Sequence, residues 1–324
     1  MVAKVPRTVA ALVALAFLAS ALAAPALAGA TTAPKAREEK DKIVLENDQI
    51  TVWFQGKKPM IKILPANKTE AAFDVKLGEL VEFEDLDKNG APSANEVRAT
   101  LNLHQAKAWQ ITTTEEDGVV VLTMTLEAPL KYKGAVPETP LDDLVNKDRV
   151  GNVTLVFRLG STTVTLPAGN TTLTLLPTET KFDLYVNKWT WADGAKNLLA
   201  LTFDAGEKGN ATLAETGPRA ALGTANTTRG YFTWLETAEA VKDGANITVP
   251  VTGHALDEPG RYALVYGVGG FTSLLHDPTI GASPTGEPVT ETTVPENLST
   301  VPAAGTLLAV AAVGAAAVLV ARRK

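Results

Sequence analysis

The sequence predicts an all-β fold, in which an antiparallel β-sandwich ectodomain precedes a single C-terminal transmembrane helix. Three observations carry this prediction. Segments rich in β-branched and aromatic residues recur along the chain, and many of them alternate apolar with polar positions. Gly, Pro, Asn and Asp separate these segments at intervals of about ten residues, as turns between short strands do. Helical periodicity is weak except at the two ends of the chain.

The N-terminus has the pattern of a signal peptide over residues 1–28. Lys4 and Arg7 precede an apolar run, and the small residues at 26–28 provide a cleavage site of the A-x-A type. An N-terminal membrane anchor is the alternative, but it would need a longer apolar run. Residues 29–40 are then a linker in front of the folded body.

Six segments of the body have the composition of strands. They cover residues 50–54, 119–126, 153–159, 171–176, 182–186 and 247–251. Pro177 interrupts the strand pattern near the middle of the body. This favours two consecutive β-sandwich regions, at 41–178 and 179–278, with one large two-sheet structure as the alternative.

Residues 85–96 read DLDKNGAPSANE and carry recognisable chemistry. They resemble the calcium loop of the EF-hand family at each position that the family specifies, including the glycine at position 6. Calcium is a hard cation that takes about six to eight oxygen ligands, so short oxygen-bearing side chains must turn inward around it. The resemblance implies that Ca²⁺ is held by Asp85, Asp87, Asn89, the backbone carbonyl of Ala91, Ser93 and Glu96.

The flanks of this loop depart from the EF-hand pattern. Residues 80–84 and 97–103 alternate like strands, whereas an EF-hand has helices on both sides. We therefore expect a structural calcium site that rigidifies a β-hairpin. The alternative is a plain hairpin turn at Asn89-Gly90 whose acidic residues are merely solvated. Magnesium is a poorer match, because it retains more water and uses fewer protein ligands.

The C-terminal part of the chain predicts a membrane anchor. Residues 279–302 are rich in Pro, Thr and Glu and are expected to form an extended stalk. Residues 303–321 contain no charge, and as a helix they would span about 28 Å, close to the hydrocarbon thickness of a bilayer. The basic cluster at 322–324 should stay in the cytoplasm, which places the ectodomain outside the cell membrane. A buried core helix is the alternative for 303–321.

This tail resembles the sorting tails of prokaryotic surface proteins, in particular the archaeal PGF-CTERM type. Those tails combine a Thr/Pro-rich stalk, a short Pro-Gly motif, an apolar helix and a terminal basic cluster. Here residues 301–305 read VPAAG and occupy the motif position without its phenylalanine. The resemblance covers only this tail and implies a protein displayed on the cell surface.

Sequons and charge agree with an exported body. All 36 acidic residues lie within 29–301 together with 25 of the 30 basic residues, a net charge of −11. This excludes nucleic acid as a favoured partner, because nucleic acid requires a clustered positive surface. Seven N-x-S/T sequons predict glycosylation at Asn67, Asn152, Asn170, Asn210, Asn226, Asn246 and Asn297.

The sequence contains few recognisable catalytic motifs, so we do not expect this protein to be an enzyme. The chain has no cysteine and no G-x-S-x-G motif, and its three histidines do not have zinc-ligand spacing. Trp189 and Trp191 alternate on one strand face, either as a platform for a sugar or as part of the core. The sequence thus predicts a membrane-anchored, glycosylated structural or adhesion protein, with an envelope protein or glycan as partner. A carbohydrate- or peptide-binding module is the alternative, and an extracellular glycosidase is less favoured.

Overall fold

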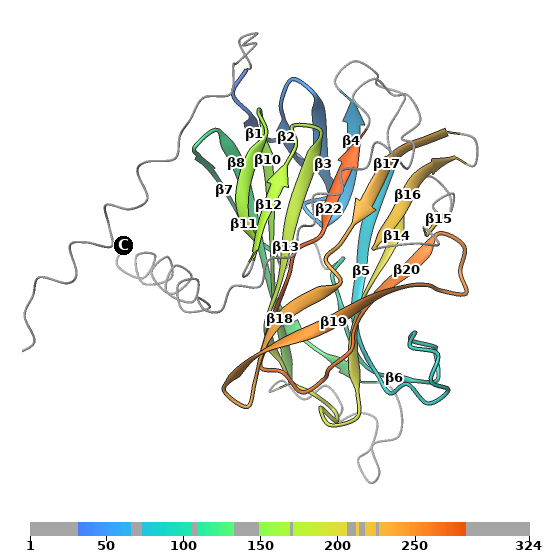
Figure 1. The fold of residues 1–324 in the computed structure, drawn as a ribbon. Coiled ribbons are helices and arrows are strands. Elements are labelled where there is room, and N and C mark those ends of the chain that lie inside the picture. The colour runs from blue at the N-terminus through green and yellow to red at the C-terminus, as the bar shows by residue number, and fades with distance from the viewer. Residues whose placement is uncertain are drawn as a thin grey trace, which may run out of the picture. The chain divides into compact units, whose positions relative to one another are not determined.

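A computed structural model describes residues 32–65, 73–104, 109–132, 149–168, 171–205, 212–213, 218–224 and 227–282 (Figure 1). These residues contain 22 strands and no helix. The strand pairings among them are antiparallel, which confirms the all-β, antiparallel prediction for this part of the chain. The expected signal peptide, transmembrane helix and basic cluster lie outside the described residues.

One group of strands, called sheet A, contains most of the N-terminal part of the body. Its strands are β1 (Lys35–Glu38), β2 (Lys42–Glu46), β3 (Ile50–Gln55), β4 (Met60–Pro65), β5 (Phe73–Phe83), β6 (Val97–Asn102), β9 (Lys131–Tyr132), β14 (Leu198–Ala205), β19 (Ala245–Ala255) and β20 (Arg261–Tyr266). They follow the order β1-β2-β3-β4-β5-β14-β20-β19. β6 pairs with the second half of β5, and β9 pairs with β6.

A second group, called sheet B, faces sheet A across the core. Its strands are β7 (Gln110–Glu116), β8 (Val119–Pro129), β10 (Val150–Gly160), β13 (Glu179–Trp189), β15 (Thr212–Leu213), β16 (Arg219–Thr224), β17 (Thr227–Thr233), β18 (Thr237–Lys242), β21 (Ser273–His276) and β22 (Thr279–Ala282). β13 pairs with β22 through its first half and with β21 through its second half. β11 (Val164–Ala168) and β12 (Thr171–Leu175) form a separate hairpin.

Strand β19 joins the two sheets. Its first residues, Ala245 to Pro250, pair with β18 of sheet B, and its last residues, Val251 to Ala255, pair with β20 of sheet A. Twenty strands therefore belong to one hydrogen-bonded network. A sandwich would keep its two sheets separate, so the described body is better called a nearly closed, barrel-like sheet.

One core fills the space between the sheets, because inward-facing residues alternate along the strands. A chain of rings runs through it: Phe54 meets Phe157 at 4.6 Å between centroids, and Phe157 meets Phe182 at 5.3 Å. The series of ring contacts continues from Phe182 to Phe232 and from Phe232 to Phe203. These rings come from both sides of residue 178.

Strand pairings across residue 178 bear on the expected division of the body into two sandwiches. β13 lies after residue 178 but pairs with β10, which lies before it, and β14 pairs with β5 in the same way. The described residues from Thr32 onward also group into one unit. These pairings favour the alternative of one continuous structure over two consecutive sandwiches. β22 is buried and extends the ordered sheet four residues into the segment expected to be stalk.

Candidate metal centre

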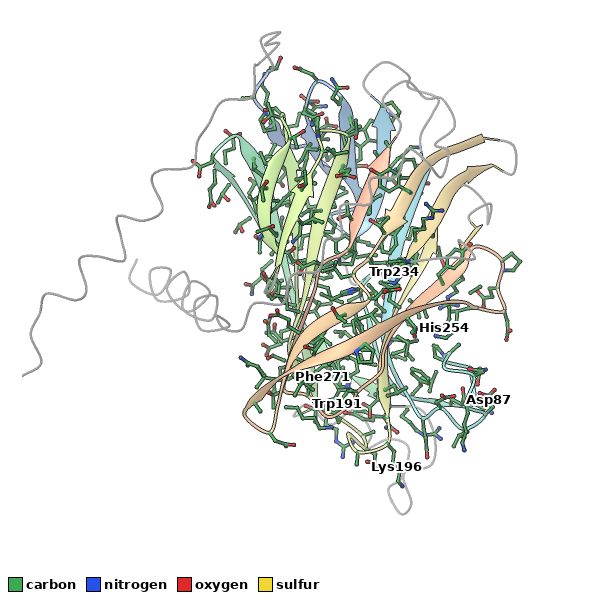
Figure 2. The ribbon with its side chains drawn as sticks, viewed as in Figure 1. Asp87, Trp191, Lys196, Trp234, His254 and Phe271 are labelled. Atoms are coloured by element: carbon green, nitrogen blue, oxygen red, sulfur yellow. The ribbon has the colours of Figure 1, made fainter. Side chains whose placement is uncertain are left out.

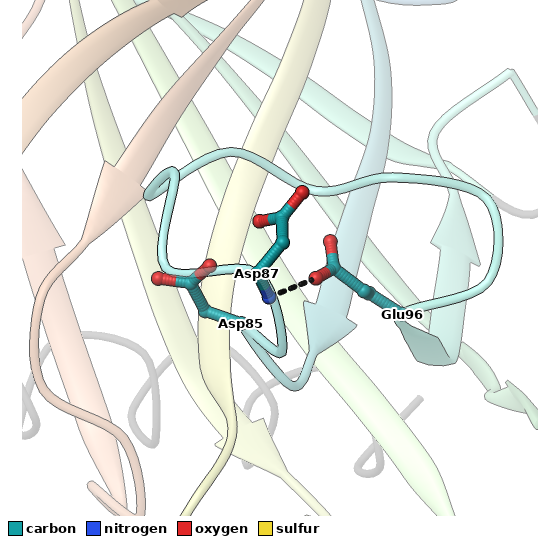
Figure 3. Close-up of side chains that lie close together, drawn as sticks. All are labelled: Asp85, Asp87 and Glu96. Atoms are coloured by element: carbon teal, nitrogen blue, oxygen red, sulfur yellow. Dashed lines mark hydrogen bonds between the residues drawn. The ribbon is translucent and has the colours of Figure 1, made fainter.

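The loop resembling a calcium site connects β5 to β6, as the alternating flanks predict (Figure 3). Asp85, Asp87 and Glu96 each place a carboxylate oxygen within 4.8 Å of the others. Lys88 and Gly90 have φ angles of 61° and 76°, so the chain bends through the left-handed region between the first and second halves of the loop. The structure thus brings together the three acidic residues that the sequence predicts.

Glu96 is 1% exposed and accepts hydrogen bonds from its own loop. Its Oε1 accepts from the backbone N–H groups of Leu86 at 2.8 Å and Asp87 at 3.2 Å. Its Oε2 accepts from the backbone N–H of Ser93 at 3.1 Å and from the Ser93 hydroxyl at 2.6 Å. Burial by itself would raise the pKa of Glu96, but these hydrogen bonds outweigh it and lower the pKa. Glu96 is therefore an ionised carboxylate that organises the loop.

One carboxylate oxygen of Asp85 accepts a hydrogen bond, and the other has no partner among the described residues. Its Oδ2 accepts a hydrogen bond from the backbone N–H of Gly90 at 3.2 Å. Its Oδ1 is buried and has no hydrogen-bond partner among the described residues. A buried polar atom without a partner costs about 1–3 kcal/mol, and more when the group is charged. A cation bound beside Asp87 and Glu96 would supply the missing interaction.

The middle of the loop is held by short side chains that cap backbone N–H groups. Asp87 Oδ1 accepts from the N–H of Asn89 at 3.1 Å, and Asn89 Oδ1 accepts from the N–H of Ala91 at 2.7 Å. The Asn89 amide also donates to Asp87 Oδ2 at 2.9 Å, and the Ser93 hydroxyl contacts Asn95 Oδ1 at 2.6 Å. These contacts preorganise the bend while the carboxylates converge.

The loop lies against a small apolar cluster on the outer side of sheet A. Phe83 and Val97, the residues on either side of the loop, belong to this cluster with Val81, Ala200 and Val265. On β19, His254 lies against the bend, because a Cβ added to Gly90 would lie 3.1 Å from its Cε1 (Figure 2). The loop thus contacts the strand that joins the two sheets.

His254 and Glu82 are neighbours of the site that sequence reasoning does not identify. His254 accepts from or donates to Thr252 Oγ1 at 2.9 Å, and burial lowers its pKa against the opposing charge of Asp85. Glu82 is fully buried on β5 and accepts from Trp189 Nε1, Asn197 Nδ2 and the Ala192 N–H. Neither residue has a distinguishing local pattern, so only the fold reveals its role.

Of the two tryptophans proposed as a sugar platform, Trp189 is buried and Trp191 is partly buried against the core. Trp189 is 5% exposed, and its Nε1 donates to Glu82 Oε2 at 3.0 Å. Trp191 packs edge-on against Phe271, and its Nε1 donates to the backbone carbonyl of Phe271 at 2.9 Å (Figure 2). Both rings therefore pack against the core, as the alternative interpretation expects, and they meet edge-on at 6.4 Å between centroids instead of forming one flat platform.

Two features of the described residues bear on the enzyme alternative, a small cavity and the buried His276. A cavity of about 280 Å³ between β1 and β7 has Glu38 as the acidic residue of its lining, and Glu38 is paired with Lys57. His276 is buried and bonds to Tyr266 and to the carbonyl of Leu235, so it is not oriented by the adjacent Asp277.

Two of the seven sequon asparagines lie in the described residues. Asn246 is exposed next to the turn between β18 and β19. Asn152 lies within β10 and donates to Glu127 Oε2 at 2.9 Å. Asn67, Asn170, Asn210, Asn226 and Asn297 lie outside the described residues.

No protein-family model matches this chain, and no curated protein matches it. Within the part of the chain that the structure describes, no segment forms an apolar helix long enough to cross a bilayer.

Proposed function

We propose that this chain is a glycosylated structural or adhesion protein of the cell surface, anchored in the membrane, whose body is stabilised by Ca²⁺ at residues 85–96. The export signal, the sequons and the charge-free segment at 303–321 support the location. The acidic loop supports the metal. The buried position of Trp189 and the packing of Trp191 favour a scaffold over a sugar-binding module.

The observation that carries the calcium proposal is the unpartnered oxygen of Asp85. It is buried within a loop whose other two carboxylates, Asp87 and Glu96, converge on the same space. Three carboxylates so close together repel one another, and Ca²⁺ would remove that repulsion while supplying the partner that Asp85 lacks. Asn89, Ala91 and Ser93 are the further residues that the EF-hand pattern assigns as ligands.

Binding at this position would act on stability. The loop joins two paired strands, adjoins an apolar cluster and touches His254 on β19. Holding it in one conformation therefore fixes the β5–β6 hairpin against the strand that connects the sheets. Because strands flank the loop, we expect a rigid joint instead of the opening motion of helical calcium sensors.

Thermal unfolding of the full chain in millimolar Ca²⁺ and in chelator tests this proposal. A site that binds only the folded state adds about 1.4 kcal/mol at ten times Kd. That should raise Tm by about 3–6 °C for a body of this size. Asp87→Asn keeps the shape of the side chain but removes a charge, so it should abolish most of the shift.

The matched control is Asp117→Asn, at an exposed turn position with a φ of 48° that asparagine tolerates. This variant should retain the full response to calcium. Equal melting temperatures with and without calcium in the unmodified chain would overturn the proposal.

A further inference from the structure

A buried lysine on β13 lies between two carboxylates. Lys181 is 0% exposed, Asp183 3% and Asp277 6%. The Lys181 ammonium nitrogen Nζ lies 2.7 Å from Asp277 Oδ1, and it also contacts Asp183 Oδ1. A lysine is almost never fully buried unless it is paired, so this arrangement calls for a physical explanation.

The topology brings these groups together from distant parts of the chain. Lys181 pairs with Thr279 of β22, and Leu184 pairs with His276 of β21. Asp277 lies in the short connection between these two strands, 96 residues after Lys181. The contact therefore ties β13 to the last two strands of the described body.

The two carboxyl groups have different surroundings. Asp183 also pairs with Arg158 on β10, and the Tyr185 hydroxyl lies 3.5 Å from its Oδ2. Burial opposes ionisation of Asp183, but Lys181 and Arg158 outweigh it and lower its pKa. Burial, together with the charge of Asp183, raises the pKa of Asp277 well above its usual range. Asp183 is thus ionised and able to accept a proton, whereas Asp277 is readily protonated.

We propose that Lys181 and Asp277 condense to an intramolecular amide bond, with Asp183 transferring the proton. Asp183 accepts a proton from Nζ, and the free amine attacks Cγ of the protonated Asp277 carboxyl group. The Nζ–Cγ bond forms, and Asp183 returns its proton to the hydroxyl oxygen of Asp277 as the bond from Cγ to that oxygen breaks, so the oxygen leaves as water. The second proton that Nζ must lose passes to Asp183, which ends the step protonated. The step consumes no oxidant or other reagent.

Two physical effects favour this reaction at a buried site. Folding holds the amine and the carboxyl group in contact, which replaces an encounter between two separate molecules. The product also replaces a buried ion pair, whose desolvation is costly, by a neutral amide. A chain without cysteine would gain in this way a covalent link between β13 and the strands that lead to its C-terminus.

Peptide mass spectrometry of the full chain, purified from the cells that make it, tests the proposal. A chymotryptic digest should contain one species that joins the Lys181 and Asp277 peptides, lighter by one water molecule than their sum. Lys181→Arg keeps the buried charge but cannot form the amide, so it should release two separate peptides. Asp183→Asn removes the base and should reduce the linked fraction at least several-fold.

Lys188→Arg, an exposed lysine on the same strand, is the control and should remain linked. Separate, unlinked peptides in the unmodified chain would overturn the proposal, as would a link from Lys181 to Asp183. The readout does not involve calcium, so the result is independent of the metal site.

Discussion

At the scale of single residues, some buried carboxylates of the described body are satisfied by neutral donors alone. Glu82 is the clearest case, because its carboxylate accepts from an indole, an amide side chain and backbone N–H groups of the segment between β13 and β14. These contacts connect strand β5, just before the acidic loop at 85–96, to Trp189 at the other side of the core. They explain how a charged residue tolerates complete burial.

Glu82→Gln should destabilise the protein by about 1–3 kcal/mol, because the glutamine NH₂ group would face donors in place of an acceptor. Urea unfolding measures the difference. Glu79→Gln, on the same strand but only partly buried, is the matched control and should have little effect. Equal stability of the two variants would contradict the role assigned to Glu82.

Glu179 provides a second residue-scale case. It is 5% exposed, and it accepts hydrogen bonds from the Tyr231 hydroxyl and from the Leu176 N–H at 2.8 Å. The Tyr231 ring crosses Gly281 to reach it, since a Cβ on Gly281 would lie 2.1 Å from the ring. Burial is the main cause that raises the pKa of Glu179.

This raised pKa implies a direction for stability against pH. The folded chain holds the Glu179 proton more tightly than the unfolded chain, whose glutamate pKa is about 4.3. The contribution is therefore complete below that pH and is lost as pH rises through the folded pKa. Glu179→Gln should flatten the fall in unfolding free energy with pH, measured by urea titration. The exposed Glu236→Gln should leave the slope unchanged, and a similar slope for both variants would contradict the prediction.

At the scale of elements, alternation and turn residues predict strands but not their partners. Each of the six predicted strand segments overlaps an observed strand, and the flanks of the acidic loop at 85–96 are strands as expected. The Asp-Gly pairs at 117–118 and 243–244 have positive φ and form the turns of two hairpins. Asp-Gly between alternating segments is itself a sequence signal for a hairpin. By contrast, the passage of β19 from one sheet to the other depends on neighbours that no local pattern specifies.

The functional residues likewise divide into those that a local sequence pattern predicts and those that only long-range strand pairing brings together. A local pattern suffices for Asp85, Asp87 and Glu96, because a calcium loop is contiguous in sequence. Lys181 and Asp277 could not be paired in advance, because an isolated lysine in an alternating strand does not indicate which distant carboxylate will face it. Long-range pairing of β13 with β21 and β22 creates that contact.

Strand position also predicts which sequons carry sugar. Asn246 is exposed beside a tight turn, whereas Asn152 lies in β10, between β8 and β13, with its amide bonded to Glu127. Asn246→Gln should therefore remove one glycan mass from the protein made in its native cells, and Asn152→Gln should not. Intact mass spectrometry before and after deglycosylation decides this, and loss of a glycan in Asn152→Gln alone would contradict it.

At the scale of the whole described body, one core and one hydrogen-bonded network explain why the expected boundary at residue 178 is not visible in the pairings. A break in strand pattern at Pro177 is a local event, whereas a domain boundary requires that few contacts cross it. Here β10 and β13 pair along nearly their full length across that point. Composition alone could not distinguish these cases.

The position of β22 has a mechanical consequence. This strand lies between β13 and β17 and is the last described segment before the chain continues toward its C-terminus. Tension applied at Ala282 along the strand would shear the hydrogen bonds to both neighbours together, instead of peeling them apart one after another. Survival under tension depends on the unfolding rate, so this geometry suits a protein that must stay attached while the surface around it is pulled.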